Sequence, residues 1–157
     1  PQMKTPNSKK ITMTRTKSAK QKRIFGNNRT CLISDEADIE EAVRCTMLIA
    51  GKIGFRETVS CMIGTAVSEL ARNIHRYAKT GGAIHISELR RARKTGVEIV
   101  ATDNGPGIKD IRKAMQDNYS TTAGSLGIGL PGVKRFMDEF KIKSGKGTTV
   151  IVRKWAK

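Results

Sequence analysis

The stretch ETVSCMIGTAVSELARNIHRY, residues 57–77, contains the strongest helical periodicity in the chain. Its apolar side chains recur every three or four residues, which predicts a long amphipathic helix. The apolar stripe consists of Ile63, Ala66, Val67, Leu70, Ala71, Ile74 and Tyr77. Glu69 and Asn73 are neighbours one turn apart on one shoulder of this stripe. A carboxylate and an amide at a core edge can take part in site chemistry, although such a pair on a helix is most often surface decoration.

The segments around this helix alternate between strand-like and helical patterns. The predicted elements are a short apolar run at residues 31–33, a helix that begins after Ser34 and ends at residues 51–54, strands at 83–87 and 97–102 joined by a basic turn at 90–94, helices at 110–117 and 130–140, and strands at 141–143 and 148–154. Ser34 is a suitable N-cap for the first helix. This order predicts an α+β fold, a two-layer α/β sandwich with the helices on one face of a mixed β-sheet.

The positive charge of the chain is concentrated near its N-terminus. The formal net charge is +16, and residues 1–29 carry nine of the 30 Lys and Arg residues and no acidic residue. Because this segment has too few apolar residues to offset the entropy of ordering it, we expect a disordered basic arm over residues 1–29 and one folded domain over residues 30–157. The arm is suited to phosphates or an acidic partner, but a solvated tail is the simpler interpretation, and nucleic acid is a disfavoured partner.

The cysteines and the apolar runs bear on the cellular compartment. Cys31, Cys45 and Cys61 are an odd number at spacings that match neither a disulfide framework nor a set of metal ligands. No apolar run approaches the ~20 residues of a membrane helix, and the N-terminal residues lack the apolar centre of a secretory signal. These features predict a cytoplasmic protein without a membrane segment.

Two glycine-rich segments are candidate ligand sites. The residues DNGPG, 103–107, end a predicted strand. They form either a simple turn or an adenine site, in which the Asp103 carboxylate accepts the exocyclic amine and the glycines leave space for the base. The residues GSLGIGLP, 124–131, lead into a helix whose free amides favour phosphate. The strand and the later acidic residue of a dinucleotide fold are missing around this loop, and a Walker loop is absent. Phosphate binding therefore needs another architecture.

Four motifs in sequence order resemble those of a known ATPase superfamily. Glu69-x-x-x-Asn73, Asp103-x-Gly105-x-Gly107, Gly124-x-x-Gly127-x-Gly129 and Gly147-Thr148 resemble the N, G1, G2 and G3 boxes of the GHKL ATPases, which have the Bergerat fold. The segments TAVSELARNIHRY (65–77), DNGPGIKDIRK (103–113) and GIGLPGVKRFMDEF (127–140) are similar to the RsbT switch kinases of bacterial stressosomes. The resemblance covers about residues 30–155.

The resemblance implies a role for each matching position. Glu69 is expected to be the general base and Asn73 the Mg²⁺ ligand. Asp103 is expected to bind adenine, with help from Thr148 through water. The other expected ATP contacts are Gly105, Gly107 and Ile108 around the base, Gly124 in a phosphate lid over residues 118–126, and Gly127, Ile128, Gly129 and Leu130 at the following helix. Phosphoryl transfer depends mainly on positioning and charge neutralisation, so this small set is sufficient.

The resemblance also implies an activity and its partners. The expected protein is a serine/threonine kinase that uses Mg²⁺ and ATP to phosphorylate STAS-domain scaffold proteins in stress signalling and that binds a downstream effector after its release. The alternative is an anti-sigma or partner-switching binding protein in which nucleotide only regulates docking. Tyr77 stands where the related anti-sigma kinases usually carry histidine, which favours the switch kinases. His75 and His85 are expected to be structural or surface residues.

Overall fold

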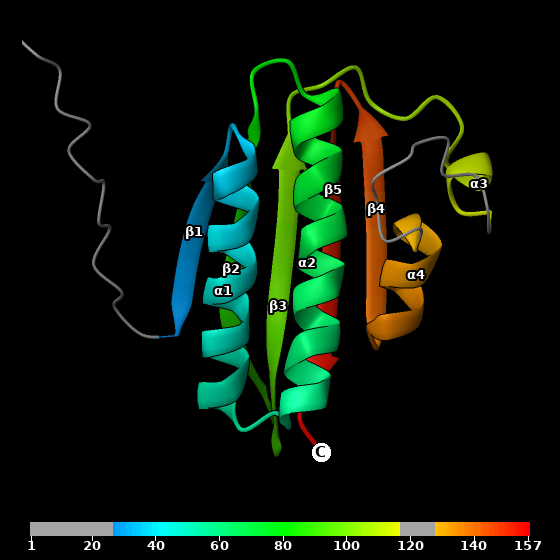
Figure 1. The fold of residues 1–157 in the computed structure, drawn as a ribbon. Coiled ribbons are helices and arrows are strands. Elements are labelled where there is room, and N and C mark those ends of the chain that lie inside the picture. Colours follow the sequence, from blue (N-terminus) through cyan, green and yellow to red (C-terminus); the bar gives the residue numbers. More distant parts are fainter. Residues whose placement is uncertain (1–26, 117–127) are drawn as a thin grey trace, which may run out of the picture.

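The computed structural model describes residues 27–116 and 128–157, which form a two-layer α+β sandwich (Figure 1). The elements are β1 (Asn28–Ile33), α1 (Glu36–Ile53), α2 (Glu57–Tyr77), β2 (Gly82–Arg91), β3 (Lys94–Asp103), α3 (Ile111–Ala114), α4 (Gly129–Phe136), β4 (Glu139–Gly145) and β5 (Gly147–Trp155). The five strands lie in the order β1-β2-β3-β5-β4. Helices α1 and α2 lie across one face of this sheet, and α4 lies beside α2 on the β4 side (Figure 1). The predicted class and layering are confirmed.

One detail of the predicted sheet is wrong. All four pairings between the described strands are antiparallel, where the sequence suggested a mixed sheet. Two of the pairings, β2 with β3 and β4 with β5, are hairpins with short connections, and a hairpin necessarily joins antiparallel strands. Strand β1 also begins at Asn28, so Asn28 and Arg29 belong to the sheet, whereas the sequence placed them in the arm.

The core lies between the sheet and the two long helices. Helix α2 has the predicted bounds, and it buries the stripe that was predicted apart from Tyr77, which is 53% exposed. Its fully buried side chains include Ile63, Val67 and Leu70. They belong to one cluster with the inward residues of the strands, among them Ile84, Ile86, Val97, Ile99 and Val152. Within the described part of the chain, no helix combines the length and apolar character that a membrane crossing requires.

Helix α1 begins one residue later than predicted. Its N-cap is Asp35, not Ser34. The Asp35 carboxylate accepts from the Asp38 backbone N–H at 3.0 Å, and the Asp38 carboxylate accepts from the Asp35 N–H at 3.1 Å, which is a reciprocal capping box. The Asp38 carboxylate also accepts from the Ser34 N–H at 2.8 Å. Asp35 is the N-cap because Asp38, three residues later, supplies the second carboxylate of the capping box. The helix ends, as predicted, at Gly54, whose φ is 100°.

All three cysteines are free thiols. Cys31 on β1 and Cys45 on α1 are buried between the sheet and the helix, while Cys61 is exposed. Burial, followed by the hydrogen bond that Cys45 donates to Glu41, raises the pKa of the Cys45 thiol to about 12. The expectation that these residues form no disulfide framework is confirmed, and the two buried thiols contribute to packing.

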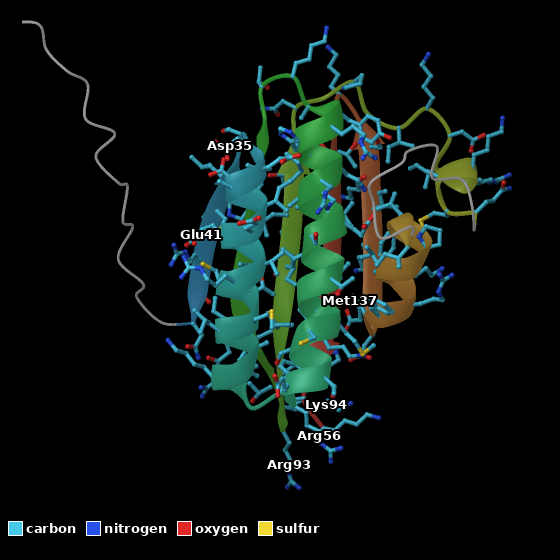
Figure 2. The ribbon with its side chains drawn as sticks, viewed as in Figure 1. Asp35, Glu41, Arg56, Arg93, Lys94 and Met137 are labelled. Carbon is cyan, nitrogen blue, oxygen red and sulfur yellow. The ribbon has the colours of Figure 1, made fainter. Side chains whose placement is uncertain are left out.

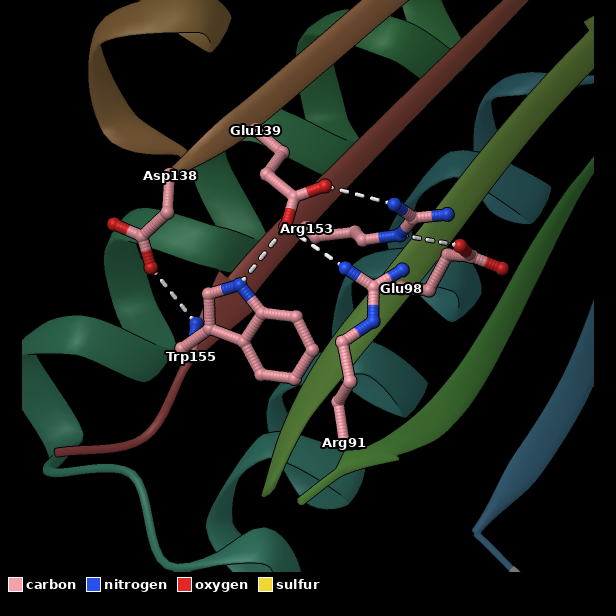
Figure 3. Close-up of polar contacts among 6 residues, drawn as sticks. All are labelled: Arg91, Glu98, Asp138, Glu139, Arg153 and Trp155. Carbon is pink, nitrogen blue, oxygen red and sulfur yellow. Dashed lines mark hydrogen bonds and ion pairs between the residues drawn. The ribbon is translucent and has the colours of Figure 1, made fainter. Parts of the chain in front are cut away.

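The C-terminal helix is shorter than predicted. Helix α4 ends at Phe136, and residues predicted as its last turn form the start of β4 at Glu139. Arg153 of β5 lies between Glu98 and Glu139, at 2.6 Å and 2.7 Å, while Trp155 donates its indole N–H to Glu139 at 3.1 Å (Figure 3). The Asp138 carboxylate accepts from the Trp155 backbone N–H at 2.8 Å. These contacts to β5 stabilise an extended backbone that local helical periodicity did not reveal.

Replacing the cap residue tests the observed start of α1. Asp35→Ala should lower the free energy of unfolding by about 1 kcal/mol, because the orphan amides of the first turn lose an acceptor. Ser34→Ala is the matched control, and it should change stability by less than about 0.5 kcal/mol, as expected for a surface substitution. Urea unfolding followed by circular dichroism measures both values. Equal losses from the two variants would contradict the assignment of Asp35.

The ion pairs around β5 predict a dependence of stability on pH. Hydrogen bonds from Arg153 and Trp155 hold the pKa of Glu139 below its ordinary value of 4.5. A carboxyl group with a lowered folded-state pKa stabilises the fold above pH 4.5 and loses that contribution as the pH falls below it. Glu139→Gln should therefore be less stable at neutral pH and should lose less of its thermal midpoint on acidification than the parent chain. Glu40→Gln, at an exposed position of α1, should keep the parent's pH dependence.

Candidate nucleotide-binding site

The helix that carries Asn73 and the strand that ends at Asp103 meet at one end of the sandwich. A Cβ placed on Gly82 would lie 2.8 Å from Ile74 Cγ2 and 3.1 Å from Asp103 Cα. A Cβ on Gly105 would lie 2.8 Å from the Tyr77 carbonyl oxygen. The last turns of α2 are thus in close contact with the end of β3. This end is opposite to the basic β2–β3 turn, where Arg93 and Lys94 lie near Arg56 (Figure 2). The structure therefore brings two of the predicted motifs together.

Asp103 is oriented by the loop that follows it. The backbone N–H of Gly105 donates to Asp103 Oδ1 at 2.7 Å, so one carboxylate oxygen has a fixed partner. The other oxygen, Oδ2, is then the candidate acceptor for a ligand. Asp103 is half-buried, and Thr148 of β5 is its direct cross-strand partner. The predicted adenine acceptor and its predicted helper consequently lie side by side.

The loop after Asp103 lies directly on the β4–β5 turn. Gly107 has a φ of 78°, and a Cβ there would be 2.1 Å from the Gly145 carbonyl oxygen, so only glycine fits. The Gly147 N–H donates to the Gly105 carbonyl at 2.8 Å. The Ile108 N–H donates to Ser144 Oγ at 2.6 Å. These contacts fix the position of the glycine loop beside Asp103.

Glu69 is the most unusual polar group of the described residues. Its side chain is 2% exposed, and Oε1 has no hydrogen-bond partner in the part of the chain that the structure describes. A buried carboxylate oxygen without a donor is costly, so native structures rarely leave one unless it has a functional role. Asn73 lies one turn further along α2 and is half-buried. Glu69 is therefore buried and Asn73 is half-buried beside it on the predicted helix shoulder. Such a pair suits a ligand that brings hydrogen-bond donors or a hydrated metal ion.

The predicted phosphate-binding helix is present in part. Helix α4 begins at Gly129, whose φ is 53°, after Ile128 as the N-cap. Leu130 is buried, and Pro131 occupies the first turn, where its missing N–H costs nothing. Gly124, Gly127 and the rest of the predicted lid lie outside the described residues. His75 and His85, expected to be structural or surface residues, are both exposed.

The sequence analysis overlooked one residue of this region. Ser144 Oγ accepts from Ile108, lies 3.2 Å from Thr148 Oγ1 and lies 3.4 Å from the Gly147 carbonyl. Ser144 connects the loop after β3 to the residues that lie beside Asp103. Its position three residues before Gly147-Thr148 is the only sequence signal that it carries.

Comparison with known proteins identifies the family of this chain. Residues 32–154 match the family model described as the histidine kinase-like ATPase domain. A solved structure of the RsbU and RsbW domains of a Mycobacterium tuberculosis protein has a similar fold, with a TM-score of 0.56 at 15% sequence identity. The match covers 83% of this chain and 33% of that one, so the chain spans about one third of the longer protein. The chain belongs to the family of histidine kinase-like ATPase domains, and it binds ATP.

Two curated relatives narrow the assignment. The chain is 47% identical to the serine/threonine-protein kinase RsbT of Bacillus subtilis over 132 residues, which cover 82% of this chain and 98% of that kinase. It is 39% identical to an anti-sigma F factor of a Thermoanaerobacter species over 59% of this chain and 68% of that protein. Within the family, this chain is an RsbT-like serine/threonine protein kinase of the partner-switching type.

The contact between the glycine loop and the β4–β5 turn can be tested by adding a methyl group. Gly107→Ala should lower the free energy of unfolding by about 1–3 kcal/mol, because alanine is strained at positive φ, and the clash with Gly145 O should also weaken ATP binding. Gly145→Ala is the control, since a Cβ there meets nothing within 4 Å. Chemical unfolding and ATP titration measure the two effects. A Gly107→Ala chain that binds ATP as tightly as the parent would contradict the placement of this loop in the site.

Proposed function

We propose that the folded domain, which begins with β1 at Asn28, transfers the γ-phosphoryl group of ATP to a serine or threonine of a STAS-domain scaffold protein. The basic residues before it would be a separate segment. The observation that carries the proposal is the buried side chain of Glu69, one turn from Asn73 on α2, whose Oε1 has no hydrogen-bond partner among residues 27–116 and 128–157. A group of this kind can accept the proton of an attacking hydroxyl. The similarity to RsbT supports the choice of substrate class.

Each remaining site residue has a proposed task. Asp103 Oδ2 accepts the exocyclic amine of adenine, and Thr148 assists through water. Gly105, Gly107 and Ile108 would border the base, and contacts with the β4–β5 turn fix the backbone of this loop. The phosphates would lie at the start of α4, near Ile128, Gly129 and Leu130, and Gly124 and Gly127 are proposed as further phosphate contacts. Free amides at a helix N-terminus favour anions.

The residues present are compatible with a magnesium ion. Mg²⁺ keeps several waters and usually takes only one or two protein oxygens besides phosphate, so the amide oxygen of Asn73 is an adequate ligand. Bound Mg²⁺ would neutralise charge on the phosphates during transfer. Glu69 Oε1, which has no partner in the described part of the chain, would accept from a water or a substrate hydroxyl.

The proposal extends to the partners and the compartment. We propose a cytoplasmic kinase that exchanges between its phosphorylation substrate and a downstream effector that it binds after release. The similarity to anti-sigma F factors supports a second candidate, in which the nucleotide controls protein docking without transfer. The two candidates differ in a single measurable product, a phosphorylated partner.

Incubation with labelled ATP and purified STAS-domain proteins tests this function. The parent chain should label a serine or threonine of the substrate in the presence of Mg²⁺. Glu69→Gln should reduce the transfer rate about 10²- to 10⁴-fold, as is typical for loss of a general base, while ATP binding persists. Glu40→Gln is the matched control and should transfer at the parental rate.

Two further variants separate the tasks within the site. Asn73→Ala should remove the effect of Mg²⁺ on ATP affinity, and Asp103→Asn should weaken ATP binding with or without the metal. Isothermal titration in the presence and absence of Mg²⁺ measures both. Absence of label on every STAS-domain protein, combined with normal ATP binding, would support the docking candidate and contradict the kinase substrate proposed here.

A further inference from the structure

We propose that Ser144 is a positioning residue for base recognition: its hydroxyl directs the proton of the Thr148 hydroxyl toward the adenine edge and so favours ATP over nucleotides with the opposite hydrogen-bonding pattern. The inference rests on the proposed nucleotide site and adds a determinant of base specificity to it. Ser144 lies on β4, outside the four motifs, three residues before Gly147.

The contacts of Ser144 restrict how its hydroxyl can be oriented. The Ile108 N–H donates to Oγ at 2.6 Å, so one acceptor position of the hydroxyl is used. A serine hydroxyl has one proton to donate and two acceptor lone pairs. Two acceptors lie within reach of that proton, Thr148 Oγ1 at 3.2 Å and the Gly147 carbonyl at 3.4 Å. The Gly147 carbonyl can only accept, whereas either hydroxyl of the Ser144–Thr148 pair can be the donor. We assign the Ser144 proton to Thr148 Oγ1, the nearer of the two acceptors; with the proton on the Gly147 carbonyl instead, Thr148 would donate to Ser144 and Ser144 would not orient it toward the base.

A hydroxyl that accepts from Ser144 is free to donate its own proton elsewhere. Thr148 is the cross-strand partner of Asp103, so its hydroxyl and Asp103 Oδ2 belong to the same end of the sheet. This pair would present one acceptor, Asp103 Oδ2, next to one donor, the Thr148 O–H. The order of donor and acceptor is retained if a water stands between Thr148 and the base, because each hydroxyl in such a chain passes its proton in the same direction.

Adenine has the complementary pattern at its Watson–Crick edge. Its exocyclic amine donates and its N1 accepts, which suits an acceptor beside a donor. Hypoxanthine, the base of ITP, has a carbonyl oxygen and an N1–H at these places, so both hydrogen bonds would be mismatched. A site that leaves buried polar groups unpaired rejects such an analogue. Ser144 thus acts on the base through Thr148.

The experiment compares ATP and ITP binding to the full chain and to Ser144→Ala by isothermal titration. Loss of one neutral hydrogen bond corresponds to about a three- to tenfold weaker affinity. We expect the Kd for ATP to rise by that factor while the Kd for ITP stays the same or falls, so that the ATP-to-ITP preference declines. Ser144→Thr keeps the hydroxyl and should restore the preference.

The controls separate positioning from stability. A merely structural role, through the Ile108 N–H, would weaken ATP and ITP by equal factors and leave the preference unchanged, which would overturn the inference. Thr149→Ala removes a neighbouring β5 hydroxyl with its side chain on the opposite face of the strand, and it should retain the parental preference. If Asp103→Asn leaves ATP affinity unchanged, the proposed site itself is wrong. If only Asp103→Asn weakens ATP binding, the site stands and the role of Ser144 is rejected.

Discussion

The antiparallel pairing of β3 with β5 is the constraint on which the site depends. Its register places Asp103 opposite Thr148 at the strand ends. The same pairing brings the loop after β3 onto the β4–β5 turn, where the Gly147 N–H donates to Gly105 and Ser144 accepts from Ile108. A shift of one residue would turn each side chain to the other face of the sheet. The buried row of Val97, Ile99 and Ala101 makes that shift costly, so core packing also sets the geometry of the base site.

Helix α2 contributes side chains both to the core and to the candidate site. One face of the helix contributes to the core, with Ile63, Val67 and Leu70 fully buried. Glu69 is also buried, although its carboxylate oxygen has no partner among the described residues. An apolar residue there would avoid the cost of an unpaired buried oxygen. A carboxylate at this position fits a kinase whose substrate hydroxyl donates a hydrogen bond to Glu69 Oε1.

The end of the sheet away from Asp103 carries a network of charged side chains. Arg153 is shared between Glu98 and Glu139, and Arg91 lies over the Trp155 ring at 5.9 Å (Figure 3). These groups belong to β2, β3, β4 and β5, so they link four strands on one side of the sheet. A network of several charges contributes more than isolated surface pairs. This network therefore adds to the stability of the apolar core at the end of the sheet away from Asp103.

The sequence by itself determined helix α2, the layered α+β class and the grouping of Glu69, Asn73 and Asp103 into one hypothesis, because periodicity and motif order are local properties. Tertiary structure decided the rest. The strand at Glu139 replaced a predicted helical turn because Arg153 and Trp155 offered partners from a distant segment. The burial of Glu69 and the link through Ser144 likewise depend on residues far apart in the chain. Hydrogen bonds of this kind exist only after the sheet has formed, so no local pattern could have revealed them.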